Sequence, residues 1–220
     1  MKIKLNSVIF VVLGILVLLN FSYFRAKSIA THSVAYTYDQ GRDFNKAAEI
    51  VTKQDLTFIG PTTGIDGIFH GAWWYYYLTV PFFLFQGNPI GFYYANFIIH
   101  LLCLGILAFV LSKYAHRSIA VTIAALISVS PYFVFTSVFV GNNIMVLPAI
   151  LLFLIFHFLW LEKNPTLQHK RNLLAAAMGI SLGLVSEFEF AFGLMIIPVY
   201  IILAAIIPGL RNKLGSVNIN

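Results

Sequence analysis

Trp73-Trp74-Tyr75-Tyr76-Tyr77 opens an aromatic run, residues 72–86, that decides how the rest of the chain is threaded. The run is about 15 residues long, whereas a helix that crosses a bilayer needs about 20 apolar residues. Consecutive Trp and Tyr side chains favour the headgroup region of a membrane. We therefore predict that residues 72–86 lie at the interface, or re-enter the membrane, without crossing it.

The composition places the chain in a membrane. Of its 220 residues, 60% are hydrophobic and only 10% are charged, and the mean hydropathy is +0.86. A soluble core cannot bury that much apolar surface. The formal net charge of +6 is typical of membrane proteins whose cytoplasmic loops face anionic lipid. We expect membrane lipid as a partner and no nucleic acid.

Six longer apolar segments are predicted to span the membrane. Lys2 and Lys4 before the first one are also typical of a signal peptide, but its 18-residue run is longer than a usual signal core and favours an uncleaved helix. The six segments are residues 7–24, 90–112, 119–140, 144–160, 172–188 and 190–208. The expected organisation is a first transmembrane helix (1–24), an extracytoplasmic loop with juxtamembrane helices and the aromatic run (25–89), a five-helix membrane bundle (90–210) and a cytoplasmic tail (211–220).

Basic residues decide the direction of the chain. If residues 72–86 do not cross, the cytoplasm receives nine of the fourteen basic residues; if they do cross, it keeps only Lys2 and Lys4. Cytoplasmic loops are enriched in Lys and Arg. We therefore predict a multi-pass protein of the cell membrane with six spans and both chain ends in the cytoplasm. The nine residues are Lys2, Lys4, Lys113, Arg117, Lys163, Lys170, Arg171, Arg211 and Lys213.

This orientation gathers polar residues on the extracytoplasmic side. Of the eight acidic residues, only Glu162 remains on the cytoplasmic side. A polar, acidic site at the outer rim of a helix bundle is the expected consequence. The candidate residues placed outside are Asp39, Arg42, Asp43, His70, Asn142, Asn143, Glu187 and Glu189.

Asp39 and Asp43 are the first candidates for chemistry. A short helix is predicted from about Arg42 to Lys53. If the chain is already helical at Asp39, both carboxylates share one helix face beside Arg42. Such a pair can bind a divalent cation, or one carboxylate can act as a general base. A helix N-cap formed by Asp39 or Asp43 explains the spacing equally well.

Three further groups carry weaker signals. Glu187 and Glu189 would each cost about 2–3 kcal/mol at the centre of a bilayer, but they can also simply mark the turn between two helices. His70 can donate to a phosphate or a sugar hydroxyl, or be a solvated loop residue. Tyr75 and Tyr76 can anchor the interface or form a platform for a lipid tail or a sugar ring. No zinc-ligand spacing, Gly-x-Ser-x-Gly motif or phosphate-binding Gly-rich loop occurs.

Several motifs together resemble a known family. They are Asp39-Gln40-Gly41-Arg42-Asp43, Ile59-Gly60-Pro61-Thr62-Thr63-Gly64, Gly67-Ile68-Phe69-His70-Gly71 and the Tyr-rich segment that follows. From about residue 5 to 208 the chain resembles the N-terminal part of membrane glycosyltransferases of the GT-C class. Within that class it looks like the family 39 group, related to protein mannosyltransferases and lipid A aminoarabinose transferases. The resemblance implies an all-α polytopic transmembrane bundle, truncated relative to those longer relatives.

The resemblance also implies a reaction. Such enzymes move a sugar from a polyprenyl-phosphate donor to a hydroxyl of a protein, lipid or glycan acceptor, here with inversion at the extracytoplasmic face. Asp39 takes the position of the catalytic base. Gln40 stands where related transferases often have a second acidic residue, so Asp43 is the candidate second carboxylate for a divalent metal ion. Arg42, His70 or that cation would offset charge on the departing phosphate.

Ser130-Pro131 and the stretch from Asn142-Asn143 to Pro148 resemble the family's external corner between two helices. Two alternatives to an enzyme stay open at this point. One is a non-catalytic membrane subunit or lipid-carrier binding protein with the same fold, and the other is a small transporter with Glu187 or Glu189 on an ion path. The sequence shows no convincing internal repeat, which argues against the transporter.

Overall fold

The computed structural model describes residues 5–160 and 168–206, and every named element within these two ranges is a helix. The prediction of an all-α bundle is therefore confirmed. In chain order the elements are α1 (Leu5–Ala30), α2 (Tyr38–Lys53), α3 (Trp73–Leu84), α4 (Ile90–Leu111), α5 (Arg117–Val129), α6 (Pro131–Thr136), the 3-10 turn η1 (Asn142–Met145), α7 (Val146–Trp160), α8 (Gln168–Phe188) and α9 (Phe190–Ile206).

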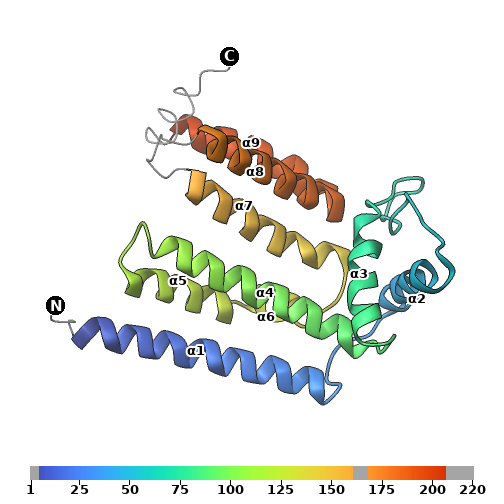
Figure 1. The fold of residues 1–220 in the computed structure, drawn as a ribbon, viewed down its shortest axis with the longest axis horizontal. Coiled ribbons are helices and arrows are strands. Elements are labelled where there is room, and N and C mark those ends of the chain that lie inside the picture. Colours follow the sequence, from blue (N-terminus) through green and yellow to red (C-terminus); the bar gives the residue numbers. More distant parts are fainter. Residues whose placement is uncertain (1–4, 161–167, 207–220) are drawn as a thin grey trace.

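The long helices lie side by side, and two shorter ones cover one end of the row. The packing order is α1, α5, α4, α7, α8 and α9, while α3 runs across their direction and contacts α2, α4 and α8 (Figure 1). We call this end the capped end; it consists of α2, α3, the loop 54–72, the corner 137–145 and residues 187–189. The aromatic run starts and finishes there, since α1 ends and α4 begins at the same end (Figure 1).

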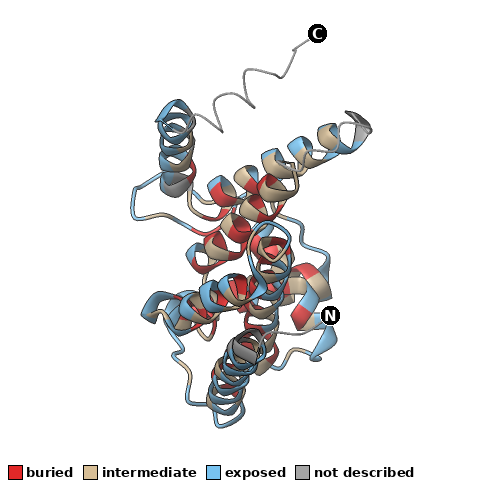
Figure 2. Ribbon diagram, turned by 90° about the vertical axis from the view of Figure 1, so that its left-hand side faces the viewer, coloured by how far each residue is buried: buried red, intermediate tan, exposed pale blue. Residues whose placement is uncertain are grey.

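The outer surface of the long helices is apolar. Figure 2 shows buried residues between the helices and exposed ones around them, and the exposed set includes large apolar side chains such as Leu16, Phe109 and Ile202. Apolar surface on this scale is found where a protein meets lipid or a partner. Within the described residues three helices are long and apolar enough to cross a membrane, which indicates a membrane protein. They are Val11–Ala30, Ile90–Leu111 and Asn142–Trp160.

Polar side chains inside the bundle bind backbone carbonyls. Asn96 is buried in α4, and its Nδ2 donates to the carbonyls of Thr136 and Phe139 at 2.8 and 2.7 Å. Nδ1 of the buried His100 lies 2.8 Å from the carbonyl oxygen of Asn96. The two Asn96 hydrogen bonds satisfy carbonyls at the end of α6 and in the corner that follows it, which the helix itself leaves unpaired. They fix the corner against α4.

The predicted span 119–140 is wrong as a single helix. α5 ends just before Ser130, which is extended (φ −62°, ψ 139°) and precedes Pro131. Proline has no N–H, and its ring disfavours helical backbone in the residue before it. Oγ of Ser130 accepts the N–H of Phe133 at 3.3 Å and so begins α6. The chain then passes through the corner 137–145 into α7.

The other boundaries differ less from the prediction. α1 continues to Ala30, beyond the predicted end at Phe24, and stops before His32, whose φ of 55° is left-handed. α3 and α4 begin and end within two residues of the predicted bounds. The predicted tail 211–220 and Glu162 lie outside the described residues.

Gly14 lets α1 pack directly on α5. It is buried, and a Cβ atom added to it would lie 1.8 Å from Cγ1 of Val121 and 3.3 Å from its Cβ. Val121 is β-branched and has few rotamers with which to make room. Gly105 in α4 is the opposite case, because no heavy atom lies within 4 Å of a Cβ added there.

Gly14→Ala is expected to lower the free energy of unfolding by about 1–3 kcal/mol, because an extra methyl group is forced into a packed contact. Gly105→Ala makes the same chemical change in open space and should be neutral or stabilising by up to about 1 kcal/mol, since alanine is the better helix former. Thermal unfolding of the purified chains in detergent measures both. Equal midpoints for the two variants would contradict the contact between α1 and α5.

Candidate functional site

α2 begins four residues earlier than predicted. Thr37 is its N-cap, and Oε1 of Gln40 reaches back to accept the Thr37 N–H at 2.6 Å. The interpretation in which Asp39 or Asp43 caps the helix is therefore wrong, since both lie inside it. Asp39 falls in the first turn, where the helix dipole favours a negative charge.

One face of α2 is buried against the bundle. Phe44 stacks on Phe92 of α4 with ring centroids 3.9 Å apart. Nε2 of the buried Gln40 donates to the carbonyl of Val140 in the corner at 2.7 Å. The buried residues of α2 are Gln40, Asp43, Phe44, Ala47 and Ile50, which recur at helical spacing. This face fixes the position of α2 and therefore the direction of its other face.

The guanidinium of Arg42 lies between the two candidate carboxylates. Its Nη1 is 3.1 Å from Oδ1 of Asp39, and its Nη2 is 2.8 Å from Oδ1 of Asp43. The other oxygen of Asp43 accepts the indole N–H of Trp74 in α3 at 2.7 Å. The side chain of Asp43 is only 3% exposed, whereas that of Asp39 is 71% exposed.

The two carboxylates therefore have different environments. Burial raises the pKa of Asp43, and the hydrogen bonds from Arg42 and Trp74 offset part of that rise. Asp39 remains open to solvent on the other side of the same guanidinium. Carboxylates kept in contrasting environments can take different roles, one as a fixed partner and the other as a group that exchanges protons.

The proposed metal ligands do not suit a metal ion in this arrangement. Both oxygens of Asp43 already accept hydrogen bonds, and Arg42 occupies the space between Asp43 and Asp39. Across residues 5–160 and 168–206, no group of three or more His, Cys, Asp or Glu side chains is placed to hold a metal. The positive charge between the two carboxylates is that of Arg42.

The second face of α2 lines a cavity of about 890 Å³. Its α2 wall consists of Tyr38, Gly41, Arg42, Asn45, Lys46 and Glu49. The opposite wall is formed by Tyr36, Thr37, Thr57, Ile59 and Tyr75. Burial raises the pKa of the Tyr75 phenol, which therefore stays protonated and can donate a hydrogen bond at neutral pH. The cavity thus combines cationic groups with aromatic rings.

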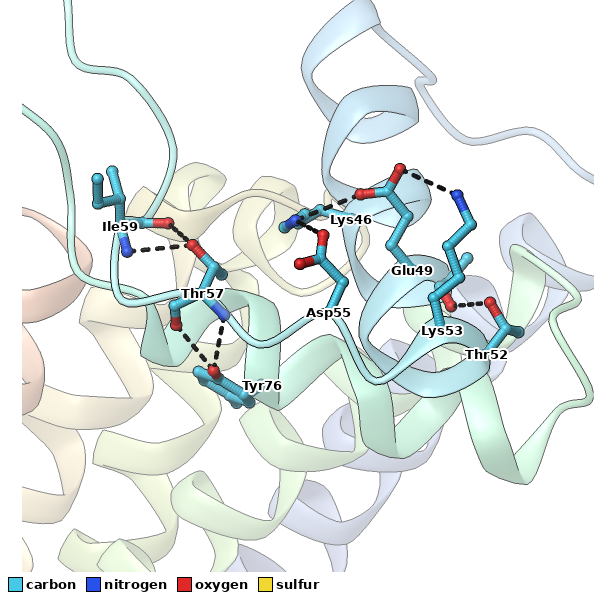
Figure 3. Close-up of polar contacts among 9 residues, drawn as sticks. Lys46, Glu49, Thr52, Lys53, Asp55, Thr57, Ile59 and Tyr76 are labelled. Atoms are coloured by element: carbon cyan, nitrogen blue, oxygen red, sulfur yellow. Dashed lines mark hydrogen bonds and ion pairs between the residues drawn. The ribbon is translucent and has the colours of Figure 1, made fainter.

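Lys46 is held toward the cavity by two carboxylates. Its Nζ lies 2.7 Å from Oδ2 of Asp55 and 3.3 Å from Oε2 of Glu49 (Figure 3). The hydrogen bond to Asp55 is the main cause of a raised pKa for Lys46, so the ammonium group stays charged. Lys46 joins the loop 54–72 to α2 through this contact.

Tyr76 positions the opposite wall. Its hydroxyl donates to the carbonyl of Thr57 at 2.7 Å and accepts the N–H of the same residue at 3.1 Å (Figure 3). Thr57 and Ile59 are thereby placed on the cavity. Of the two tyrosines selected from the sequence, Tyr75 lines the cavity and Tyr76 holds the loop that forms its wall.

Glu187 belongs to a second group of contacts at the capped end. Its carbonyl accepts the N–H of Gly71 at 3.0 Å, and its Oε1 accepts the N–H of Trp73 at 3.5 Å. A Cβ atom on Gly71 would lie 1.7 Å from the carboxyl carbon of Glu187, so a larger residue at position 71 would require the Glu187 carboxylate to move. Nδ2 of Asn142 donates to the carbonyl of Phe188 at 2.9 Å. These residues join the end of α8 to the loop and the corner.

Of the predicted site residues, Arg42 and Tyr75 line the cavity. Asp39 and Asp43 adjoin it through their ion pairs with Arg42, and the other candidates lie elsewhere at the capped end. His70 is half-buried in the loop. Its backbone N–H donates to the carbonyl of Pro61 at 2.8 Å, and its ring Nδ1 is buried without a hydrogen-bond partner. Asn143 is exposed in η1, and the half-buried Glu189 lies between α8 and α9. The structure therefore brings Asp39, Arg42, Asp43 and Tyr75 together, and it places the other candidates at the same end but in different contacts.

The sequence analysis missed several cavity residues. They share one face of α2 with Gly41 and Arg42, because each lies three or four residues from another member of the set. They are Tyr38, Asn45, Lys46 and Glu49. That spacing was available in the sequence. The predicted start at about Arg42 left Tyr38 outside the helix, and the helix face that Asn45, Lys46 and Glu49 share with Arg42 was overlooked.

Comparison with known proteins finds no matching family model, no matching curated protein and no matching solved structure.

Trp74→Phe is expected to destabilise the chain by about 1–3 kcal/mol, because it removes the indole donor and leaves an oxygen of the buried Asp43 without a partner. The adjacent Trp73→Phe is the matched control, since Trp73 is 63% exposed and an exposed substitution usually changes stability by less than about 0.5 kcal/mol. Thermal unfolding in detergent compares the two. A larger loss of stability in Trp73→Phe than in Trp74→Phe would contradict the role of Asp43 in joining α2 to α3.

Proposed function

We propose that this chain is an integral-membrane glycosyltransferase that moves a sugar from a polyprenyl-phosphate donor to an acceptor hydroxyl at the extracytoplasmic face. The observation that carries the proposal is the cavity beside Asp39 and Arg42 at one end of an apolar-surfaced helix bundle. A donor of this kind has its headgroup at the membrane surface and its tail in lipid. A polar cavity directly above a lipid-facing bundle suits both parts of such a molecule.

Each group of the site has a role in this proposal. The acceptor oxygen attacks the anomeric carbon with inversion, the bond from that carbon to the phosphate oxygen breaks, and the electron pair leaves with the lipid phosphate. The exposed Asp39 takes the acceptor's proton. Arg42 and Lys46 offer positive charge to the departing phosphate, and Asp43 holds Arg42 in place.

The aromatic residues of the cavity suit a sugar. Tyr36, Tyr38 and Tyr75 all line it. Tyrosine offers both an apolar ring face and a hydroxyl, which match the C–H face and the hydroxyls of a sugar ring. The proposal uses no metal ion, because Arg42 supplies the positive charge between the two carboxylates.

The proposed orientation has six spans and places the capped end outside the cytoplasm. The spans are α1, α4, α5 with α6, α7, α8 and α9, in a fold like the N-terminal half of a GT-C enzyme. All described carboxylate side chains lie at the capped end, in α2, in the loop 54–72 or at residues 187–189. Lys113, Arg117, Lys170 and Arg171 lie at the opposite end, as cytoplasmic basic residues should.

One observation favours a second candidate, a non-catalytic protein that binds a lipid-linked sugar carrier. Asp39 is ion-paired to Arg42, and a general base needs its carboxylate free to accept a proton from the acceptor. If that ion pair persists with ligand bound, the same cavity binds the carrier without turning it over.

Asp39→Asn is expected to lower sugar transfer by about 10²–10⁴-fold, the usual contribution of a general base, while membrane insertion stays intact. Asp66→Asn is the matched control, because Asp66 is an exposed loop carboxylate without an ion pair to Arg42, whereas Asp39 is paired to Arg42 at the edge of the cavity. The assay uses the full chain in proteoliposomes with radiolabelled polyprenyl-monophosphate hexoses and pentoses as donors.

The same assay separates the candidate functions. Labelled product that depends on Asp39 supports the transferase. Donor binding without product supports the carrier-binding protein, and uptake of label into the lumen supports a transporter. Turnover that is unchanged in Asp39→Asn would exclude Asp39 as the base.

Single-cysteine labelling tests the orientation. Asp66→Cys at the capped end should react with a membrane-impermeant maleimide in intact cells, whereas Lys113→Cys at the opposite end should react only after permeabilisation. Both positions are exposed, and the native Cys103 is buried in α4, so it should add little background. Labelling of Lys113→Cys from outside would reverse the proposed topology.

A further inference from the structure

A second cavity lies in the lipid-facing surface, between α1 and the neighbouring helices α5 and α6. Its volume is about 480 Å³. The α1 side consists of Leu13, Leu16, Val17, Asn20, Phe21 and Arg25. The other side includes Val129 and Val134. We call it the α1 groove; its walls are apolar except for Asn20 and Arg25.

Arg25 is a cation without an anionic partner. Its guanidinium carbon lies 3.5 Å from the ring centroid of Phe21, and its Nη1 donates to the carbonyl of Phe21 at 3.3 Å. Its Nε is buried and has no hydrogen-bond partner. No carboxylate of the described residues forms an ion pair with it. A half-buried guanidinium with an unused donor can bind an anion strongly, because the resulting hydrogen bonds are charge-assisted.

The α1 side of the groove is about as long as one lipid leaflet is thick. Leu13 and Arg25 are twelve residues apart on α1, which at 1.5 Å per residue is about 18 Å. Half of a hydrocarbon core of about 30 Å is about 15 Å. Arg25 directly follows the apolar run that ends at Phe24, so it lies at headgroup depth when that run fills the membrane.

We propose that the α1 groove binds an anionic phospholipid of the bilayer, with its phosphate on Arg25 and one acyl chain along Leu16 and Val17. Charge decides the choice of occupant. A zwitterionic lipid brings its own cation to the phosphate, whereas an anionic lipid supplies the charge that Arg25 lacks within the protein. The groove shares no lining residue with the cavity beside Asp39, so this proposal does not depend on the proposed function.

The headgroup half of the proposal is tested by native mass spectrometry of the full chain, titrated in detergent with phosphatidylglycerol or with phosphatidylcholine. The wild type should bind phosphatidylglycerol in preference. Arg25→Gln should weaken that binding about tenfold, the effect of losing one charge-assisted hydrogen bond. Lys27→Gln is the matched control. Lys27 lies two residues after Arg25, carries the same charge, is exposed and does not line the groove.

The acyl-chain half is tested by filling the groove. Leu16→Trp should lower phosphatidylglycerol binding, whereas Leu19→Trp should not, because Leu19 is equally lipid-facing but outside the groove. Thermal unfolding confirms that each variant is folded, and bound lipid should raise the midpoint of the wild type and of both controls.

Four results would overturn the proposal. They are equal binding of the two lipids, equal losses in Arg25→Gln and Lys27→Gln, displacement of the lipid by soluble glycerophosphate alone, and a dimer whose formation Leu16→Trp abolishes. The third result would indicate a simple anion site, and the fourth would indicate that a second copy of the chain covers the groove.

Discussion

A single buried carboxylate, that of Asp43, ties the capped end together. It accepts hydrogen bonds from Arg42 on its own helix and from Trp74 on α3. A buried charge that loses a partner costs about 1–3 kcal/mol, so α2 and α3 pack most stably here when both donors are in place. The position of Arg42 follows from this requirement, and the position of Asp39 at its outer edge follows in turn.

The two faces of α2 explain how a packed helix can also carry a site. One face is held by Phe44 on α4 and by Gln40 on the corner. The opposite face is left free to line the cavity with Arg42 and Lys46. The site is therefore built on a regular element anchored on two sides, which fixes its side chains more closely than a loop would.

Local patterns were enough to predict most of the architecture. The all-helical class, most helix bounds and the grouping of Asp39, Arg42 and Asp43 were all recognised from composition and spacing. Pro131 divides the predicted span 119–140 into α5 and α6. The prediction missed this break because it gave more weight to apolar content than to the effect of proline on helices. The predicted start of α2 fell four residues late because Thr37 and Gln40 were not recognised as a capping pair; Gln40 accepts the Thr37 N–H at the helix N-terminus. The contact between Gly71 and Glu187 joins residues more than a hundred positions apart, and no local pattern predicts such a contact.

The walls of the main cavity differ in strength. On one side the half-buried Tyr76 forms two hydrogen bonds with the backbone of Thr57. On the other side the loop is attached to α2 by the ion pair between Lys46 and the exposed Asp55, and such surface pairs contribute only about 0–1 kcal/mol and weaken in salt. Salt therefore weakens the hold on the Lys46 side chain, which lines the cavity, while the wall at Thr57 keeps its two hydrogen bonds.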